Sequence, residues 1–454
     1  MGEIPEFEKL GATLGIPIRG AYSLCPGSIM HLQSFLLVVL SLSCGSLPAG
    51  EVDMMRAIVA TAGMITAWWI LCHVAARTTS RQVMAGNIEP IQGAQWLETQ
   101  LDVFRWLSLG VVVMCLGGFG LARSLDTLPV IQNSMFLQAL VLLFPGLALA
   151  AASWSAEHRY GVLLDYTDRG VGSHLRSIIS SFRGATAWLV VPVLMLLASA
   201  DAIMQLPISK TQTGWVMGVS LVVFLVAGMP WLVSRLFKTD ALDSDTEHWV
   251  ANVLSAAGLR RTKMVRWQTE GNSFNAMITG VVPPLRTLLL SDRLLDELPR
   301  EQVAMVVLHE AAHLRRRHVP LRMLSILPAW AVGASVTHFA GDAGWAMVAG
   351  SVVAIGLTLV MLRWVAYRTE FDADVQACRL AEQIASSVDG VPSTYAAAAE
   401  TLSRALIRVT ADHPAARKPT WLHPGVVDRI EFMRRQRIIP NNNSVTAGTI
   451  ANPV

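Results

Sequence analysis

The residues with the clearest chemical capacity lie in one stretch, Leu308 to His318. It contains the pattern His-Glu-Ala-Ala-His at 309–313, with two histidines four positions apart. On an α-helix, positions i and i+4 lie on one face, about 6 Å apart along the axis, so both imidazoles can bind one metal ion. Glu310 then lies beside a metal-bound water and can act as its general base, as in zinc hydrolases. The alternative interpretation is a pair of surface histidines on a polar helix.

A hydrolytic zinc site needs a third protein ligand and one position left open for water. In metzincins this ligand is a histidine ten residues after the first, but Val319 occupies that position here. We interpret His318 as a histidine at the helix end. A better source is the acidic segment that begins at Glu370, in which Asp374 again follows four residues later. Glu370 can bind the metal, and Asp374 can accept a hydrogen bond from a ligand histidine and fix its tautomer.

The composition indicates a membrane protein. Of 454 residues, 53% are apolar and 15% are charged, whereas soluble domains carry about 25% charged residues. The net charge of +3 is too small to indicate a nucleic-acid partner, and none is expected. Five scattered cysteines form no CxxC pair, so neither a disulfide framework nor a cysteine-ligated zinc is indicated.

Apolar runs predict eight membrane spans, six before the motif and two after it. A crossing needs about 20 apolar residues. Most runs approach this length, but the first is short and can instead belong to a signal peptide. The runs are Phe35–Leu47, Ala57–Ala76, Trp106–Ala122, Met135–Trp154, Ala185–Leu206, Trp215–Phe237, Leu321–Ala340 and Trp345–Tyr367. The ionisable residues within or near them, His73, Asp201 and His338, are interpreted as structural or interfacial.

The basic residues of the predicted loops indicate an orientation. Nine Lys and Arg fall on the motif side of the membrane and three on the other, so the motif side is expected to be cytoplasmic. Two crossings separate His313 from Glu370, so the chain returns to the same side and Glu370 can reach the metal. We interpret Arg315–Arg317 as an anchor to lipid headgroups. The protein is thus expected in the cell membrane, with its active site facing the cytoplasm.

The fold class predicted from these features is mainly α, a multi-pass membrane protein with an α+β zinc protease domain. Short strands are predicted at Met264–Thr269, Ser273–Thr279 and Thr287–Leu290, before the motif helix. The predicted segments are a membrane region at 1–237, a first protease half at 238–319, a transmembrane hairpin at 320–367, a second half at 368–438 and a disordered tail at 439–454.

Four motifs, in this order, resemble those of metallopeptidase family forty-eight. That family includes membrane heat-shock proteases and the CAAX prenyl proteases. The motifs are Asn275-Ala276-Met277, the HExxH pattern at 309–313, Glu370-Phe371-Asp372-Ala373-Asp374, and His423-Pro424 followed by Arg429-Ile430. The resemblance covers about 240–318 and 367–437. It implies a gluzincin fold in which His309, His313 and Glu370 bind Zn²⁺.

The resemblance also implies roles for the two outer motifs. His423 is expected to stabilise the oxyanion, with Arg429 near the site, and the strand at Asn275 and Ala276 is expected to pair with substrate backbone. Trp421-Leu422 replaces the small residue that usually precedes the histidine, and Met277 replaces an aromatic residue. A helix-capping role is the alternative for His423.

These interpretations predict a membrane zinc endopeptidase that hydrolyses peptide bonds with a zinc-activated water. Its substrate would be a peptide or a membrane protein, in membrane quality control or processing. The alternatives are a receptor-type metalloprotease that transduces a signal, a CAAX-type prenyl-protein protease, and a non-catalytic membrane scaffold or transporter. A site-two-type intramembrane protease is disfavoured because its motif lies inside an apolar span, whereas this helix ends in three arginines.

Overall fold

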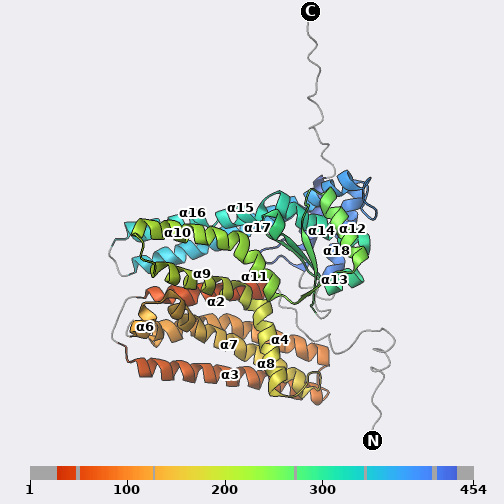
Figure 1. Ribbon diagram of the computed structural model, residues 1–454. Coiled ribbons are helices and arrows are strands. Elements are labelled where there is room, and N and C mark those ends of the chain that lie inside the picture. The colour runs from red at the N-terminus through yellow and green to blue at the C-terminus, as the bar shows by residue number, and fades with distance from the viewer. Residues whose placement is uncertain are drawn as a thin grey trace, which may run out of the picture. The chain divides into compact units, whose positions relative to one another are not determined.

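The computed structural model (Figure 1) describes residues 28–47, 52–125, 128–269, 274–341, 345–411 and 417–436. The chain divides into two compact units. The N-terminal unit comprises 1–239 with 267–273, and the C-terminal unit comprises 240–266 with 274–454. The predicted tail at 439–454 lies outside the described residues, as do most of the residues before the first apolar run.

The N-terminal unit consists of long apolar helices. The π-helical turns η5 and η6 each join two helices into a longer segment, and η3 extends α4 at its C-terminal end. The elements are α2 (Ser28–Ser43), η2 (Cys44–Ser46), α3 (Met54–Met84), α4 (Pro90–Val113), η3 (Met114–Gly118), α5 (Leu121–Ser124), α6 (Pro129–Gln132), α7 (Met135–Leu163), α8 (Val171–Phe182), η5 (Arg183–Ala187), α9 (Trp188–Met204), α10 (Lys210–Val223), η6 (Phe224–Gly228) and α11 (Met229–Leu236).

Seven segments in the described part of the chain are long and apolar enough to cross a membrane. They match the last seven predicted runs, so the predicted multi-pass helical class is confirmed. The first run forms α2, which has 16 residues and is shorter than a crossing needs. The seven segments are Met54–Met84, Pro90–Gly118, Met135–Leu163, Val171–Met204, Lys210–Leu236, His318–Phe339 and Ala346–Ile384.

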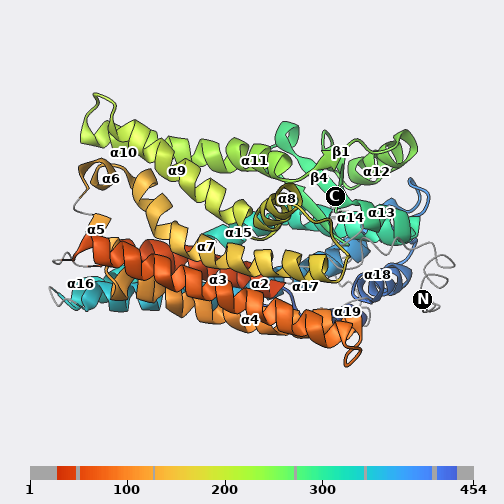
Figure 2. The same cartoon turned by 90° about the horizontal axis from the view of Figure 1, so that it is seen from below.

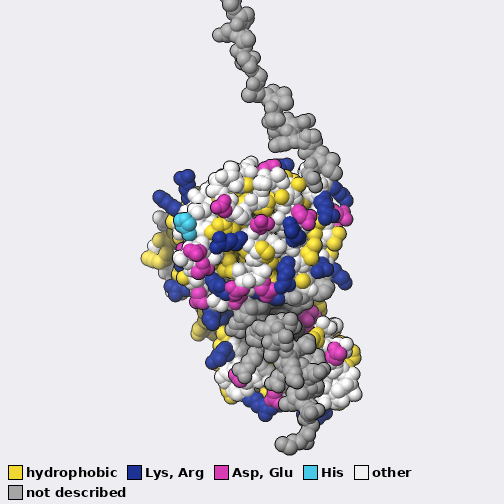
Figure 3. Space-filling model, turned by 90° about the vertical axis from the view of Figure 1, so that its right-hand side faces the viewer, with side chains coloured by type: hydrophobic (Ala, Val, Ile, Leu, Met, Phe, Trp, Pro, Cys, Tyr) yellow, Lys and Arg dark blue, Asp and Glu magenta, His cyan; other side chains and the backbone are white. Residues whose placement is uncertain are grey.

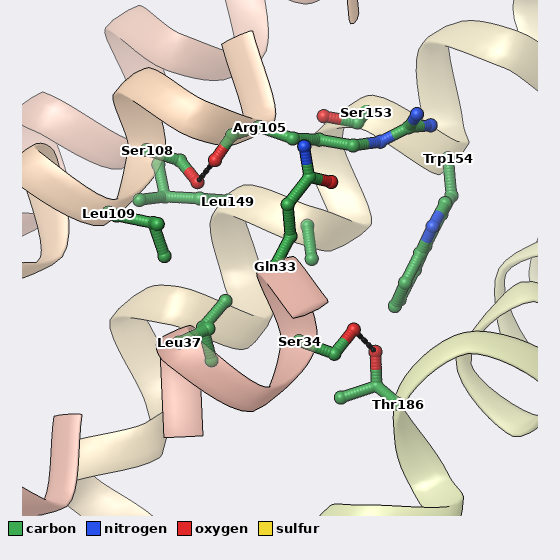
Figure 4. A pocket seen from close by; sticks show the side chains of 11 residues that line it. Gln33, Ser34, Leu37, Arg105, Ser108, Leu109, Leu149, Ser153, Trp154 and Thr186 are labelled. Carbon is green, nitrogen blue, oxygen red and sulfur yellow. Dashed lines mark hydrogen bonds between the residues drawn. The ribbon is translucent and has the colours of Figure 1, made fainter. Parts of the chain in front are cut away.

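Helices α3, α4 and α7 lie side by side in both ribbon views (Figures 1 and 2) and share one apolar core. A small pocket lies between α2, α4, α7 and η5 (Figure 4), and the amide of Gln33 points toward Arg105 there. The Arg105 guanidinium donates to Asp102 at 2.7 Å and also pairs with Glu157. The charge of Arg105 is therefore compensated inside an apolar unit, as burial of an ionised group requires.

Asp201 has a structural role in this unit. Its carboxylate accepts hydrogen bonds from the backbone N–H groups of Met135 and Phe136, both at 2.9 Å, and from the Ser134 hydroxyl at 2.6 Å. The two backbone N–H groups have no partner within the first turn of α7, so Asp201, which lies in α9, caps the start of α7.

The C-terminal unit combines helices with a small sheet. Its elements are α12 (Ser244–Ala256), β2 (Lys263–Trp267), β3 (Ala276–Thr279), η7 (Pro283–Leu285), β4 (Thr287–Ser291), α13 (Asp292–Glu297), α14 (Arg300–Arg315), α15 (His318–Leu324), α16 (Leu327–Phe339), α17 (Ala346–Ile384), α18 (Tyr395–Val409) and α19 (Val426–Gln436), with β1 (Thr239–Asp240) at the boundary between the units. On the face of this unit in view in Figure 3, Lys and Arg are interspersed with Asp and Glu.

The four-stranded sheet has the order β1-β2-β4-β3, so β3 is an edge strand. It pairs antiparallel with β4, from Ala276 opposite Leu290 to Thr279 opposite Thr287. All of β4 is buried, and Leu288 and Leu290 join the core that also contains Val303 and Val307 of α14. The sheet and the motif helix are therefore held by one apolar core.

The hairpin of α16 and α17 packs through small residues. A Cβ added to Gly350 would lie 2.6 Å from the backbone oxygen of Gly333, and one added to Gly333 would lie 2.6 Å from the oxygen of Gly350. Such close approach is how membrane helices associate without a hydrophobic driving force. Helix α17 has 39 residues and runs without interruption through the acidic motif. The predicted limit at residue 367 falls inside this helix, and the predicted segment limits stay predictions.

Gly350→Ala tests this packing. We expect it to lower the thermal unfolding temperature of the purified protein, because the new methyl group meets backbone that cannot rotate away; overpacking of this kind costs about 1–3 kcal/mol. The matched control is Gly356→Ala on the same helix, where a Cβ meets nothing within 4 Å. The control gains helix propensity and is expected to be neutral or stabilised. Equal effects of both substitutions would contradict the packing.

Candidate metal centre

Helix α14 positions the two histidines of the HExxH pattern. Pro299 lies just before its first residue, where proline leaves no hydrogen bond unmade. Val303, Val307 and Ala311 recur on its buried face. His309 and His313 are themselves buried, with 8% and 9% of their surface exposed. The apolar packing of α14 thus fixes both imidazoles in the interior of the unit.

Helix α17 brings the third donor to them. The Nε2 atoms of His309 and His313 lie 3.2 Å apart. The carboxylate of Glu370 lies 3.7 Å from Nε2 of His309 and 3.4 Å from Nε2 of His313. Glu370 is 3% exposed. Three potential ligand atoms from two helices therefore converge on one point.

These atoms fit a zinc ion. One ligand atom from each of His309, His313 and Glu370 can be chosen so that all lie within 4.8 Å of one another. Tetrahedral bonds of about 2 Å place ligand atoms roughly 3.3 Å apart, close to the separations observed. Two imidazoles and one carboxylate are also a common donor set of hydrolytic zinc. Within the described residues, this is the one group of its kind.

His309 has a carboxylate behind it. Its Nδ1 lies 2.9 Å from Oδ1 of Asp374, although the angle is not ideal for a hydrogen bond. Burial opposes protonation of His309, but the carboxylates of Asp374 and Glu370 outweigh burial and raise its pKa to about 9. Burial lowers the pKa of His313 to about 4. A metal ion would displace the proton of His309 and would find His313 already neutral.

Asp374 is held by Arg429 from α19. The Nε and Nη2 groups of Arg429 donate to the two carboxylate oxygens at 2.8 and 2.6 Å. Burial disfavours the charge on Arg429, but Asp374 and Glu370 outweigh it and raise the pKa of the guanidinium. This bidentate pair fixes the carboxylate that faces His309.

Further nitrogen donors surround Glu370. Nη2 of Arg322 donates to Oε1 at 2.9 Å, Nδ1 of His423 lies 3.2 Å from Oε2, and Nη1 of Arg429 lies 3.7 Å from Oε2. The His423 side chain is 52% exposed, so it lies at the open side of the cluster. The structure thus places both residues of the last motif beside the metal donors.

Glu310 lies between the donors and the edge strand. Its carboxylate accepts a hydrogen bond from the backbone N–H of Ile278 in β3 at 3.3 Å. Burial raises the pKa of Glu310, and the charge of His309 partly offsets this. The N–H of Ile278 points away from β4, so the unpaired edge of β3 faces the site.

Asn275 and Ala276 lie at the start of this strand. The backbone N–H of Asn275 donates to the Ser291 hydroxyl at 2.9 Å, and its carbonyl accepts from the Ser291 N–H, also at 2.9 Å. These bonds fix the start of β3 against β4. The predicted strand from Ser273 is shorter in the structure, since β3 begins at Ala276 and residues 270–273 are not described.

Two residues contribute to the site without a clear signal in the sequence. Arg322, which contacts Glu370, lay inside a predicted span. His318, interpreted as a helix-end residue, is the first residue of α15 and is 4% exposed, in contact with His313 and Asp372. Helical periodicity does not place His318 near His313, because i+5 lies on another helix face. Proximity in sequence to the motif was the one available signal.

Comparison with known proteins identifies the domain. Residues 240–437 match the family model described as peptidase family M48. This segment is a peptidase family M48 domain. The match confirms the predicted resemblance, and with the seven candidate spans it makes the protein a multi-pass membrane metallopeptidase.

One solved structure similar to this chain is the crystal structure of Ste24p from S. mikatae. The TM-score is 0.41 with 15% sequence identity, covering 85% of this chain and 100% of that chain. No curated protein matches the sequence.

Asp374→Ala tests the support of His309. We expect zinc affinity to fall by about 10–100-fold, because the imidazole loses the carboxylate that orients it. Competition with a chromogenic chelator measures this affinity on the purified protein. The control is Glu382→Ala, an exposed carboxylate on the same helix. Wild-type affinity in a folded Asp374→Ala protein would show that this carboxylate does not orient the ligand.

Proposed function

We propose that the protein is a zinc-dependent endopeptidase that cleaves unfolded or misassembled membrane proteins from the cytoplasmic side of the cell membrane. One observation carries the catalytic part. Two histidines and a carboxylate converge within 4.8 Å, with Glu310 beside them and the edge of β3 facing them. The site thus combines a metal-binding group, a base and a backbone-binding edge.

Zinc bound by His309, His313 and Glu370 would supply a water molecule of lowered pKa. With zinc bound, the carboxylate of Glu310 would be placed to accept a proton from the attacking water and to donate it to the leaving amine. The N–H of Ile278 fixes the carboxylate of Glu310 for this transfer. The imidazole of His423 and the guanidinium of Arg429 lie beside Glu370, where their N–H groups can stabilise negative charge on the carbonyl oxygen.

The edge strand β3 is suited to bind a substrate in an extended conformation. Asn275 and Ala276 begin a strand that lies at the sheet edge. A peptide added there as a further strand would be held through its backbone, largely without regard to side chains. Such recognition suits unfolded segments of many proteins. Quality control therefore fits better than the cleavage of one defined sequence.

A cytoplasmic site is supported by the charge distribution. The loops on the motif side carry most of the Lys and Arg between the predicted spans. Arg315, Arg316 and Arg317 follow the motif directly and precede the segment His318–Phe339, where they can contact anionic headgroups.

Two alternative functions use the same peptide-bond hydrolysis and differ from the proposed one in their substrates. A prenyl-protein protease would cleave a prenylated CAAX peptide and leave an unfolded membrane protein intact. A receptor-type protease would cleave one partner only after its stimulus. We expect the unfolded membrane protein and casein to be cleaved and the prenylated peptide to be spared. The reverse result would move the assignment to the prenyl branch.

Glu310→Gln tests the general base. We expect cleavage to fall by about 10²–10⁴-fold, because proton transfer loses its acceptor. Bound zinc should stay near one per chain, since the amide is not a ligand. Glu301→Gln, an exposed residue in the first turn of the same helix, is the control and should keep full activity. Full activity of Glu310→Gln would remove the base assignment.

Metal removal tests the site as a whole. A chelator should abolish cleavage of casein, and added zinc should restore it. Metal analysis should find about one zinc per wild-type chain and a large loss in His309→Ala, because a three-ligand site loses one ligand. Equal zinc content in His309→Ala and wild type would favour a non-catalytic protein with an accidental motif.

A further inference from the structure

His318 connects a metal-ligand histidine to a second carboxylate of α17. The backbone of Arg317 adopts the left-handed conformation, with φ 56° and ψ 38°, and turns the chain between α14 and α15. His318 thereby folds back toward the motif. Its Nδ1 lies 3.0 Å from Nδ1 of His313, and its Nε2 lies 3.0 Å from Oδ2 of Asp372. Both ring nitrogens of this buried histidine are therefore engaged.

The positions of the ring hydrogens in this hydrogen-bonded series follow from its two ends, the metal-facing nitrogen of His313 and the carboxylate of Asp372. Nε2 of His313 faces His309 and Glu370, so it must be unprotonated to bind a metal and the ring hydrogen lies on Nδ1. Nδ1 of His318 must then accept that hydrogen, which leaves its own hydrogen on Nε2. This N–H donates to Asp372, whose carboxylate can only accept. One arrangement satisfies all three residues.

We propose that His318 and Asp372 are positioning residues that fix the tautomer and ring orientation of His313 for zinc binding. This inference rests on the proposed metal function. His309 has its carboxylate directly, in Asp374. For His313 the equivalent support reaches Asp372 through the ring of His318, because Asp372 is two residues from Glu370 and projects from another face of α17.

Helix α17 then supplies three carboxylates to the centre, in addition to Glu310 of α14. Glu370 faces the metal donors, Asp374 supports one histidine and Asp372 supports the other through His318. Arg316 donates to the same Oδ2 of Asp372 at 2.9 Å and holds this carboxylate in place. The arrangement matches the general pattern in which a ligand histidine donates its second N–H to a carboxylate-linked partner.

Two substitutions distinguish the proposed positioning role of His318 from a purely structural role, such as filling the core. His318→Leu fills space and removes both hydrogen bonds. His318→Gln keeps an acceptor for the N–H of His313 and a donor for Asp372. If the hydrogen-bonded chain supports His313, the glutamine variant keeps the zinc affinity of the wild type and the leucine variant loses it.

The experiment measures zinc affinity of the full-length protein in detergent, by competition with a chromogenic chelator after metal removal. We expect His318→Leu and Asp372→Ala to bind zinc about 10–100-fold more weakly and His318→Gln to stay within about threefold of wild type. Glu382→Ala, which changes an exposed carboxylate on the same helix, is the matched control because it lies outside the chain to His313. It should also stay within about threefold of wild type. The unfolding temperature of each metal-free variant monitors folding.

The outcomes decide between the two roles. Wild-type affinity in folded His318→Leu overturns the proposal, and so does an equal loss in the leucine and glutamine variants. If His318→Leu does not fold, the comparison of His318→Gln with Asp372→Ala still decides, because only the alanine variant breaks the chain. Failure of the wild-type protein to bind zinc would instead remove the proposed function, which keeps the two failures distinguishable.

Discussion

The buried carboxylate of Glu370 is the constraint around which the C-terminal unit is built. A carboxylate with 3% exposure is costly unless positive or hydrogen-bonding groups surround it. Here two imidazoles approach from α14, Arg322 from α15, and His423 and Arg429 from beyond α18. Each of these elements is therefore tied to one point on α17. A divalent ion at this point would add the charge that two neutral imidazoles lack.

Helix α17 explains how a membrane protein can hold such a point firmly. It begins in the hairpin with α16, where Gly333 and Gly350 allow backbone contact, and continues as one helix to Ile384. The carboxylates therefore lie on the extension of a membrane segment and not on a loop. Helix α15 lies between α14 and α16, and both His318 and Arg322 reach the site from it. The membrane hairpin and the metal donors are thus parts of one continuous framework.

Much of this could be predicted because the evidence was local. The spans were visible as apolar runs, although α2, with 16 residues, is shorter than the seven segments that are long enough to cross. The pairs His309 with His313 and Glu370 with Asp374 share a helix face by spacing alone. An even number of crossings sufficed to place the two pairs on one side of the membrane. The strand limits were less accurate, as at β3, because short strands carry little periodicity.

The sequence by itself was enough to predict the candidate metal ligands, since residue type and helical spacing are properties of neighbouring positions. It also determined the membrane class, since apolar length is counted along the sequence. Only the tertiary structure decided which atoms meet: Arg322 with Glu370, Ile278 with Glu310, and His318 between His313 and Asp372. These contacts depend on a left-handed turn at Arg317 and on the packing of separate helices. Neither can be predicted from the spacing of residues, because both arise from a backbone geometry that only the assembled core selects.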